Sequence, residues 1–449
     1  MPNTETSLNK VTPIPSADAA IETIVHFVET AHPVDLAAWI AELPYEQAKS
    51  EILTLDLQRR VRTFGYLPAS FQAELVAWLS RGELAEIVTR MSADDRADLF
   101  KLLTPEQQQR LLRDLAREER EDIRRLSSYA EGTAGAIMTS DYATLSADMS
   151  TREAIGLLRR EAPEKETIYR SYILDSERRL IGSIRLHELI LAAPHTPVSE
   201  VMDPSPISAT LDMKQEEVAQ MIEHYDLLAL PVIDEGGRLV GIITHDDAAD
   251  VMQRETTEDF QRIATVSPFS ENMREASVAV LYKKRIFWLS LLVIGNLFSG
   301  AGLAYFEETI LTYVALVFFL PLLIDSSGNA GSQSATLMVR ALATGDVTLK
   351  DWRNLILREL LIATALGLTM AVVVSPVGLL RGGSDIALVV GLTMIMVVII
   401  GSLVGMSLPF LLSHFKFDPA TASAPLVTTI SDAVGVLIYF SIATAILIP

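Results

Sequence analysis

The C-terminal part of the chain constrains the fold most, because it contains five apolar stretches long enough to cross a lipid bilayer as helices. They begin near residues 286, 309, 355, 386 and 422. Backbone polar groups in lipid need partners within the protein, so helices are the expected form. Residues 283–449 are therefore predicted to be a transmembrane domain of five α-helices.

Asp432 is the most informative residue of this region. It lies in the middle of the last stretch, "ASAPLVTTISDAVGVLIYFSIATAILIP". A carboxylate at membrane depth is costly unless it faces a water-filled path or a partner. This residue, preceded by a large acidic region, indicates a regulated pathway for cations.

The second stretch contains Pro321, Asp325 and the polar run "DSSGNAGSQSAT". Irregular backbone at membrane depth is tolerated where it is buried in protein or lines a cavity. We expect this helix to be broken at the polar run, which would then line a cavity. The alternative is a helix that ends early, with the run in a cytoplasmic loop.

The net charge of −20 lies entirely in residues 1–282, since residues 283–449 carry nine acidic and nine basic side chains. Such a field attracts cations and repels nucleic acid, so no nucleic-acid partner is predicted. The absence of cysteine excludes disulfides and thiolate metal sites. The N-terminal sequence has no apolar leader, and we expect about 280 residues to remain cytoplasmic.

Basic residues predict how the chain crosses the membrane. Lys283, Lys284 and Arg285 precede the first stretch, and Arg340, Lys350 and Arg353 separate the second from the third. The first outer loop is acidic instead, with Glu307 and Glu308. The positive-inside rule places the N-terminus in the cytoplasm and the C-terminus outside. The prediction is a multi-pass protein of the cell (inner) membrane.

Residues 1–20 read as a flexible tail, and residues 21–131 as an all-α domain of short helical units. The units "LPYEQAKSEILTLD", "LPASFQAELVAWLS" and "MSADDRADLFKLLT" each begin with a helix-start signal and continue with helical apolar spacing. Such units stack and bury one face against the next. Their spacing looks irregular, so a compact superhelical bundle and a true solenoid both stay open.

Residues 132–255 contain an internal duplication. "SYILDSERRLIGSIRLHEL" aligns with "ALPVIDEGGRLVGIITHDD", and Met138, Asp175 and Gly182 align with Met202, Asp234 and Gly241. Each half has α/β character, and the pair resembles tandem CBS domains. Residues 256–282 are predicted to form a polar, amphipathic connecting helix between this pair and the membrane.

Taken together, the chain resembles the MgtE family of magnesium transporters and channels. The specific motifs are "GNAGSQSAT" and "PLVTTISD". The resemblance implies a homodimer and a Mg²⁺-selective pathway that high cytosolic Mg²⁺ closes, and it implies no enzymatic activity. Ser332 stands where the family usually has Asn, which bears on ion coordination. The pore residues that it implies, together with Asp325 of the same run, are Asp432, Asn329, Gly328, Ala424 and Thr428.

Regulatory Mg²⁺ is expected in the acidic region, where the ion would bridge carboxylates that otherwise repel one another and would so favour a closed state. Asp246 and Asp250 share one helix face. Solvated surface charge is the alternative for each candidate. The candidates are Asp94, Asp95, Asp98, Glu216, Asp226, Asp246, Asp247, Asp250, Glu255, Glu258 and Asp259.

A Thr-x-x-Asp at Thr244 and Asp247 resembles the ATP contacts of CBS pairs. The first copy has Arg185 and Glu188 at these positions, so at most one nucleotide site is expected. A divalent cation gains roughly 4–5 kcal/mol on entering a cell held at about −100 mV, so uptake needs no ATP hydrolysis. The open alternatives are a transporter of Co²⁺, Ni²⁺ or Mn²⁺ and a Mg²⁺ sensor without transport.

Overall fold

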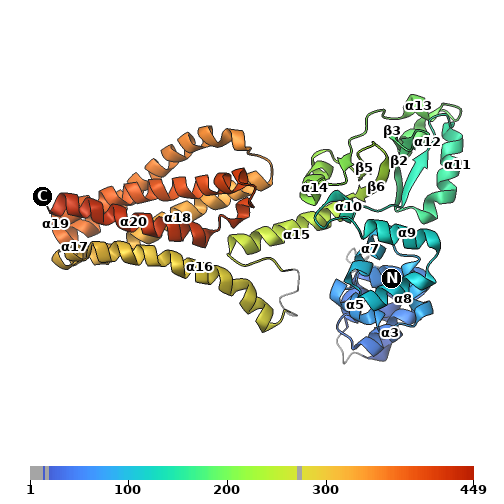
Figure 1. Ribbon diagram of the computed structural model, residues 1–449, viewed down its shortest axis with the longest axis horizontal. Coiled ribbons are helices and arrows are strands. Elements are labelled where there is room, and N and C mark those ends of the chain that lie inside the picture. The colour runs from blue at the N-terminus through green and yellow to red at the C-terminus, as the bar shows by residue number, and fades with distance from the viewer. Residues whose placement is uncertain (1–13, 16–19, 270–275, 449) are drawn as a thin grey trace, which may run out of the picture. The chain divides into compact units, whose positions relative to one another are not determined.

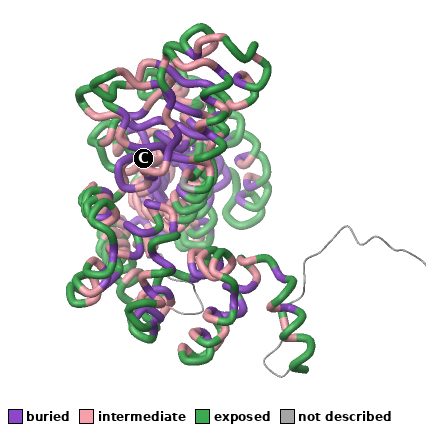
Figure 2. Tube along the Cα trace, turned by 90° about the vertical axis from the view of Figure 1, so that its right-hand side faces the viewer, coloured by how far each residue is buried: buried purple, intermediate pink, exposed green. Residues whose placement is uncertain are grey.

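The structure is a computed structural model that describes residues 14–15, 20–269 and 276–448, so most of the predicted tail at 1–20 lies outside the described residues. The chain forms two compact units, Met1–Met252 and Gln253–Pro449. The first is helical and then α/β, and the second is helical (Figure 1). Figure 2 marks the buried residues along the chain, and each unit has hydrophobic clusters of its own.

The N-terminal helices follow a strict repeat. They are α1 (Ile21–Thr30), α2 (Pro33–Ile40), α3 (Tyr45–Thr54), α4 (Leu57–Gly65), α5 (Ala69–Val76), α6 (Arg81–Val88), α7 (Ala93–Leu102), α8 (Pro105–Asp114) and α9 (Arg117–Leu126). From α2 onward, each helix begins 12 residues after the one before it. The spacing that looked irregular in the sequence is therefore regular.

The repeat arises from one apolar residue placed two positions before each helix start. Leu55, Leu67, Leu79, Met91 and Leu103 hold this position and are buried, whereas the capping residue that follows each of them varies. A buried apolar residue just before the cap fixes the angle at which the chain enters the helix. The chain therefore enters each helix of the stack at a similar angle.

The helices stack in two rows. Even-numbered helices α2, α4, α6 and α8 pack on one another in order, and the odd-numbered helices α3, α5, α7 and α9 do the same. Both rows share one hydrophobic core that includes Phe27, Phe64, Leu75 and Ile123. The predicted all-α domain of stacked helical units is therefore confirmed.

Two similar α/β halves follow. The first contains α10 (Ala134–Ile137), β1 (Tyr142–Leu145), α11 (Thr151–Glu161), β2 (Thr167–Leu174), β3 (Leu180–Arg185) and α12 (Leu186–Leu191). The second contains α13 (Val198–Val201), β4 (Ala209–Thr210), α14 (Gln215–His224), β5 (Ala229–Ile233), β6 (Leu239–Thr244) and the start of α15 (His245–Ile263). In each sheet the first two strands are parallel and the last two antiparallel. The shared topology confirms the duplication.

Aligned residues of the two halves have the same roles. Asp175 Oδ1 accepts the N–H of Arg179 at 2.8 Å, and Asp234 Oδ1 accepts the N–H of Arg238 at 2.8 Å. The two carboxylates thus close equivalent hairpin turns.

Aligned methionines and glycines pack crosswise between the halves. A Cβ on Gly241 would lie 2.6 Å from Met138 Sδ, and one on Gly182 would lie 2.6 Å from Met202 Sδ. Both glycines are required by close packing.

The predicted connecting segment, residues 256–282, is not one continuous helix. Helix α15 ends at Ile263, residues 264–269 are not helical, and the next helix begins at Val278. Thr265 has a φ of 57°, and Pro268 cannot donate the backbone hydrogen bond that a helix needs. The prediction overlooked the stop signal of Pro268, and part of the segment, residues 270–275, lies outside the described residues.

The second unit contains α16 (Val278–Tyr305), α17 (Glu307–Thr312), α18 (Ala315–Ala343), α19 (Trp352–His414) and α20 (Ala424–Leu447). Gly383 has φ 79° and ψ −170°, and it divides α19 into two helical segments. Among the described residues, three helical stretches are long and apolar enough to cross a membrane: 278–305, 349–414 and 424–447.

Helix α18 is unbroken through the polar run, which corrects the expected interruption. Ser326 Oγ donates to Leu322 O at 2.7 Å, and Ser327 Oγ donates to Val397 O of α19 at 2.8 Å. A Cβ on Gly331 would lie 2.6 Å from Gly401 O. The small residues therefore serve close helix packing.

Candidate functional site

Helices α18 and α20 bring together most of the predicted pore residues. Ser332 Oγ lies 3.3 Å from Ala424 O and 3.3 Å from Thr428 Oγ1. A Cβ on Gly328 would lie 2.8 Å from Thr428 Cγ2, so the helices approach closely here. Two residues of α18 and two of α20, from distant parts of the sequence, thus form one small patch. The serine that departs from the usual family residue lies at its centre.

Asp432 lies two turns along α20 from Ala424 and is partly buried. Its Oδ1 is buried without a hydrogen-bond partner among the described residues. A buried carboxylate oxygen without a donor is costly, because it loses its water and gains nothing in return. Such an atom is a natural ligand for a cation or for water that a cation carries.

Asp325 and Asn329 lie on an exposed face of α18. Asn329 Nδ2 donates to Asp325 Oδ2 at 3.0 Å. Asp325 also lies close enough to Asp432 to interact with it electrostatically. The two helices therefore carry carboxylate, amide and hydroxyl oxygens along this region, which are the ligand types that hard cations prefer.

A second group of acidic residues lies in the first unit. Asp94 and Asp95 are in the first turn of α7, and Asp246 and Asp247 in the first turn of α15. These four carboxylates act on one another electrostatically, so the structure unites candidates from two predicted regions. We name Asp94, Asp95, Asp98, Asp141, Glu166, Asp246 and Asp247 the acidic cluster.

Burial of the carboxyl groups makes several members of the cluster hard to ionise. It raises the pKa of Asp247 to about 7, with a further contribution from Asp94. It raises the pKa of Asp95 to about 6 and also raises that of Asp94. A cation among these groups would restore the charged forms, since an opposite charge nearby favours ionisation.

Asp141 and Glu166 are members that the sequence reasoning missed. Burial, followed by repulsion from Asp94, raises the pKa of Glu166 to about 7. The two residues directly precede Tyr142 and Thr167, which are paired across β1 and β2, and Glu166 N donates to Asp141 O at 2.8 Å. Only strand pairing brings them to the cluster, so no local motif marks them.

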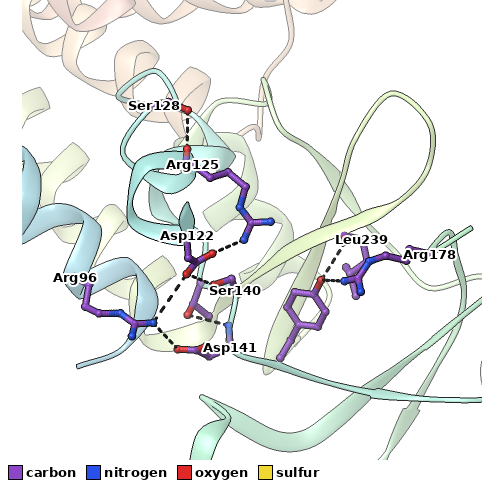
Figure 3. Close-up of polar contacts among 10 residues, drawn as sticks. Arg96, Asp122, Arg125, Ser128, Ser140, Asp141, Arg178 and Leu239 are labelled. Atoms are coloured by element: carbon purple, nitrogen blue, oxygen red, sulfur yellow. Dashed lines mark hydrogen bonds and ion pairs between the residues drawn. The ribbon is translucent and has the colours of Figure 1, made fainter. Parts of the chain in front are cut away.

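Arg96 provides a positive charge beside the cluster. Its side chain is 9% exposed and lies 3.7 Å from Asp141 and 4.0 Å from Asp122 of α9 (Figure 3). Asp122 in turn accepts hydrogen bonds from Ser140 at 2.7 Å and Arg125 at 2.5 Å. One arginine therefore links α7 and α9 to the start of β1.

A third acidic group lies on the later part of α15, in the second unit. Burial raises the pKa of Asp259, and Glu255 and Glu258 add repulsion. Arg262 lies 3.1 Å from Glu258 and forms an ion pair with Asp418. These predicted carboxylates thus lie at a contact between α15 and the segment before α20.

Three candidates lie elsewhere. Glu216 accepts from Gln220 within α14, Asp226 has a φ of 50° just after α14, and Asp250 is exposed on α15. Among the residues that the structure describes, no three His, Cys, Asp or Glu side chains are arranged to hold a metal ion.

Thr244 Oγ1 lies 2.5 Å from both Asp246 Oδ1 and Asp247 Oδ2. The equivalent residues of the first copy, Arg185 and Glu188, form an ion pair at 2.7 Å. Thr244 and Asp247, the candidate nucleotide contacts, therefore lie in the same turn as Asp246 of the acidic cluster.

Comparison with known proteins identifies the parts of the chain. Family models match residues 320–442 (MgtE, "Divalent cation transporter"), 31–132 ("MgtE intracellular N domain") and 134–195 with 198–254 ("CBS domain"). A protein named "Magnesium transporter MgtE" from Thermus thermophilus is 38% identical, and the match covers 94% of both chains.

The chain belongs to the MgtE family of magnesium transporters. Its relative of the same name from Bacillus subtilis is 32% identical over 95% of each chain. A solved structure described as the cytosolic domain of the Mg²⁺ channel MgtE in complex with ATP is 37% identical, with a TM-score of 0.49. The match covers 52% of this chain and 95% of that one. MgtE membership accounts for the helical domain, the CBS pair and the apolar helices.

Proposed function

We propose that two copies of this chain form a Mg²⁺-selective pathway in the cell membrane, lined by α18 and α20. The observation that carries the proposal is the partly buried Asp432, whose Oδ1 has no partner among the described residues. Mg²⁺ loses its water reluctantly, so a pore for it needs few direct ligands. Two Asp432 carboxylates facing across a two-fold axis would hold a hydrated ion, with Thr428 and Ser332 nearby.

The proposed membrane path has five crossings: α16, α18, the two segments of α19 and α20. The break at Gly383 supports counting α19 as two crossings. The basic residues at 283–285 and between α18 and α19 support a cytoplasmic N-terminus and an outer C-terminus. Entry of the ion is then driven by the membrane potential.

Gating is proposed to come from the acidic cluster and from the acidic part of α15. Without a cation, the neighbouring carboxylates of Asp94, Asp95 and Asp247 oppose one another's ionisation. Bound Mg²⁺ would offset that repulsion and favour the arrangement that holds the groups together. An ion that binds one arrangement better shifts the equilibrium toward it by that difference in affinity. High cytosolic Mg²⁺ would therefore close the path.

ATP is proposed as a ligand of the second CBS copy, at Thr244 and Asp247. The Thr244 hydroxyl lies against two carboxylates, so a nucleotide there would rearrange part of the acidic cluster. This supports a connection between nucleotide binding and Mg²⁺ sensing. Titration of the purified chain with ATP, with Thr244→Val as the comparison, tests it.

Mg²⁺ flux into liposomes containing the purified chain tests the main proposal. We expect flux that falls when millimolar Mg²⁺ is present on the side of the cytoplasmic domains. Greater flux of Co²⁺, Ni²⁺ or Mn²⁺ than of Mg²⁺ would contradict the proposed Mg²⁺ selectivity and favour a transporter of that other cation. Absence of flux for any of these ions would favour a sensor without transport.

A further inference from the structure

Four arginines converge on a concave surface of the helical domain, away from the acidic cluster. Arg113 of α8 and Arg117, Arg120 and Arg124 of α9 line a cavity of about 430 Å³. The α9 residues stand at positions i, i+3 and i+7, so they share one helix face. This volume lies within the range of small-ligand sites.

The charges of this cavity are poorly balanced by protein groups. Arg117 Nε donates to Glu121 Oε1 at 2.8 Å, and Glu121 is the acidic residue of the lining. Among the described residues, no ion pair within 4 Å joins a carboxylate to Arg113, Arg120 or Arg124; Asp114 acts on Arg113 from farther away and is already paired with Arg81 at 2.6 Å. Like charges one helical turn apart repel, so such a grouping is unfavourable without an anion.

The acidic excess of the rest of the chain limits which anions can bind in this cavity. The chain carries 57 acidic and 37 basic residues, and its general field repels anions. An anion would bind here only through local contacts. Arginine supplies them, because its planar guanidinium binds two phosphate oxygens at once. Gln109 adds an amide at the rim.

We infer that this cavity binds a multiply charged phosphate group. The group has two sources, a free polyphosphate and the headgroup of an anionic lipid. The site is separate from the candidate nucleotide contacts at Thr244 and Asp247. It lies on a different face of α9 from Asp122, which contacts Arg96, so the same helix carries both the phosphate site and the link to the acidic cluster.

Calorimetric titration of the full-length chain in phosphatidylcholine nanodiscs with sodium tripolyphosphate, in Mg²⁺-free buffer, tests this inference. Tripolyphosphate has neither base nor ribose and so lacks two of the three parts of ATP that a CBS nucleotide site could contact. We expect Arg113→Gln with Arg124→Gln to weaken binding by about tenfold or more. The matched control, Arg90→Gln with Arg152→Gln, removes two exposed arginines elsewhere and should leave the affinity unchanged.

The lipid source has its own readout. If the site holds a headgroup, phosphatidic acid in the nanodisc should weaken tripolyphosphate binding, and native mass spectrometry should show more retained phosphatidic acid on the wild type than on the Arg113/Arg124 variant. Lysine at both positions should restore part of the affinity. Equal tripolyphosphate binding and equal lipid retention by all variants would overturn the inference, whatever the Mg²⁺ flux.

Discussion

Gly405 of α19 lies so close to Gly331 of α18 that a Cβ on Gly405 would overlap the Gly331 carbonyl oxygen. The backbones of the two helices are therefore in direct contact at this point. Gly401 is similarly placed against the Ser327 backbone, one turn earlier. Close approach of this kind is the main use of small residues between membrane helices.

We expect Gly405→Ala to separate α18 from α19 and to destabilise the second unit by about 1–3 kcal/mol, since an added methyl group meets backbone that cannot move aside. Size-exclusion chromatography in detergent and the unfolding temperature measure the effect. Gly300→Ala is the control, because nothing lies within 4 Å of a Cβ there. A similar loss in both variants would show that the contact is not special.

Asp432→Asn should reduce Mg²⁺ flux by at least about tenfold while leaving the folded protein intact, because an amide of the same size cannot attract a divalent cation as a carboxylate does. Flux into liposomes and the chromatographic profile are the two measurements. Asp385→Asn removes a carboxylate from an exposed position of α19 and should transport normally. Unchanged flux in the Asp432 variant would refute the pore assignment.

The acidic cluster should make stability depend on pH. Unfolded carboxyl groups titrate near 4, whereas Asp95 titrates at about 6 and Glu166 and Asp247 at about 7 in the folded chain. The folded state therefore holds protons that the unfolded state releases. In Mg²⁺-free buffer, stability should fall as the pH rises from about 4 to about 7 and should then level off.

Asp247→Asn removes one of these groups. The variant should gain stability over the wild type as the pH rises, by about 2 kcal/mol at pH 8, and Mg²⁺ should shrink the difference. Unfolding temperature across the pH range measures it. Asp212→Asn changes the same charge at an exposed site and should follow the wild type. A pH-independent gain would contradict the shifted pKa.

The crosswise packing of the CBS halves offers another test. Gly241→Ala would place a Cβ 2.6 Å from Met138 Sδ and 2.9 Å from Thr139 O, so we expect a loss of about 1–3 kcal/mol. Gly156→Ala, in open space on α11, should instead stabilise slightly through helix propensity. Thermal unfolding distinguishes them, and a matching loss in both would rule out the steric explanation.

Local patterns predicted the helical domain and the duplicated α/β halves, whereas the family resemblance pointed to Gly328, Ala424 and Thr428, which the structure places beside Ser332. The 12-residue repeat was also in the sequence, but it is marked by one apolar residue, such as Leu55 or Met91, before caps of changing type. One apolar residue per unit is a weaker signal than the helix caps, so the regular 12-residue spacing was not recognised from the sequence.

Two features lay beyond local patterns. Small residues such as Gly328 and Gly331 occur both where a helix is interrupted and where two helices pack closely. The sequence therefore did not distinguish an interruption of α18 from its close packing against neighbouring helices. Asp141 and Glu166 reach the acidic cluster through strand pairing, and neither has a neighbour in sequence that indicates it.

The acidic cluster draws on both CBS copies in different ways. The first supplies Asp141 and Glu166, and the second supplies Asp246 and Asp247, while Arg185 and Glu188 neutralise each other at the matching turn of the first copy. The two copies therefore share one sheet topology but contribute different residues to the acidic cluster. Exchanging their order in the chain would preserve both sheets and disperse the charges, so the halves are no longer interchangeable.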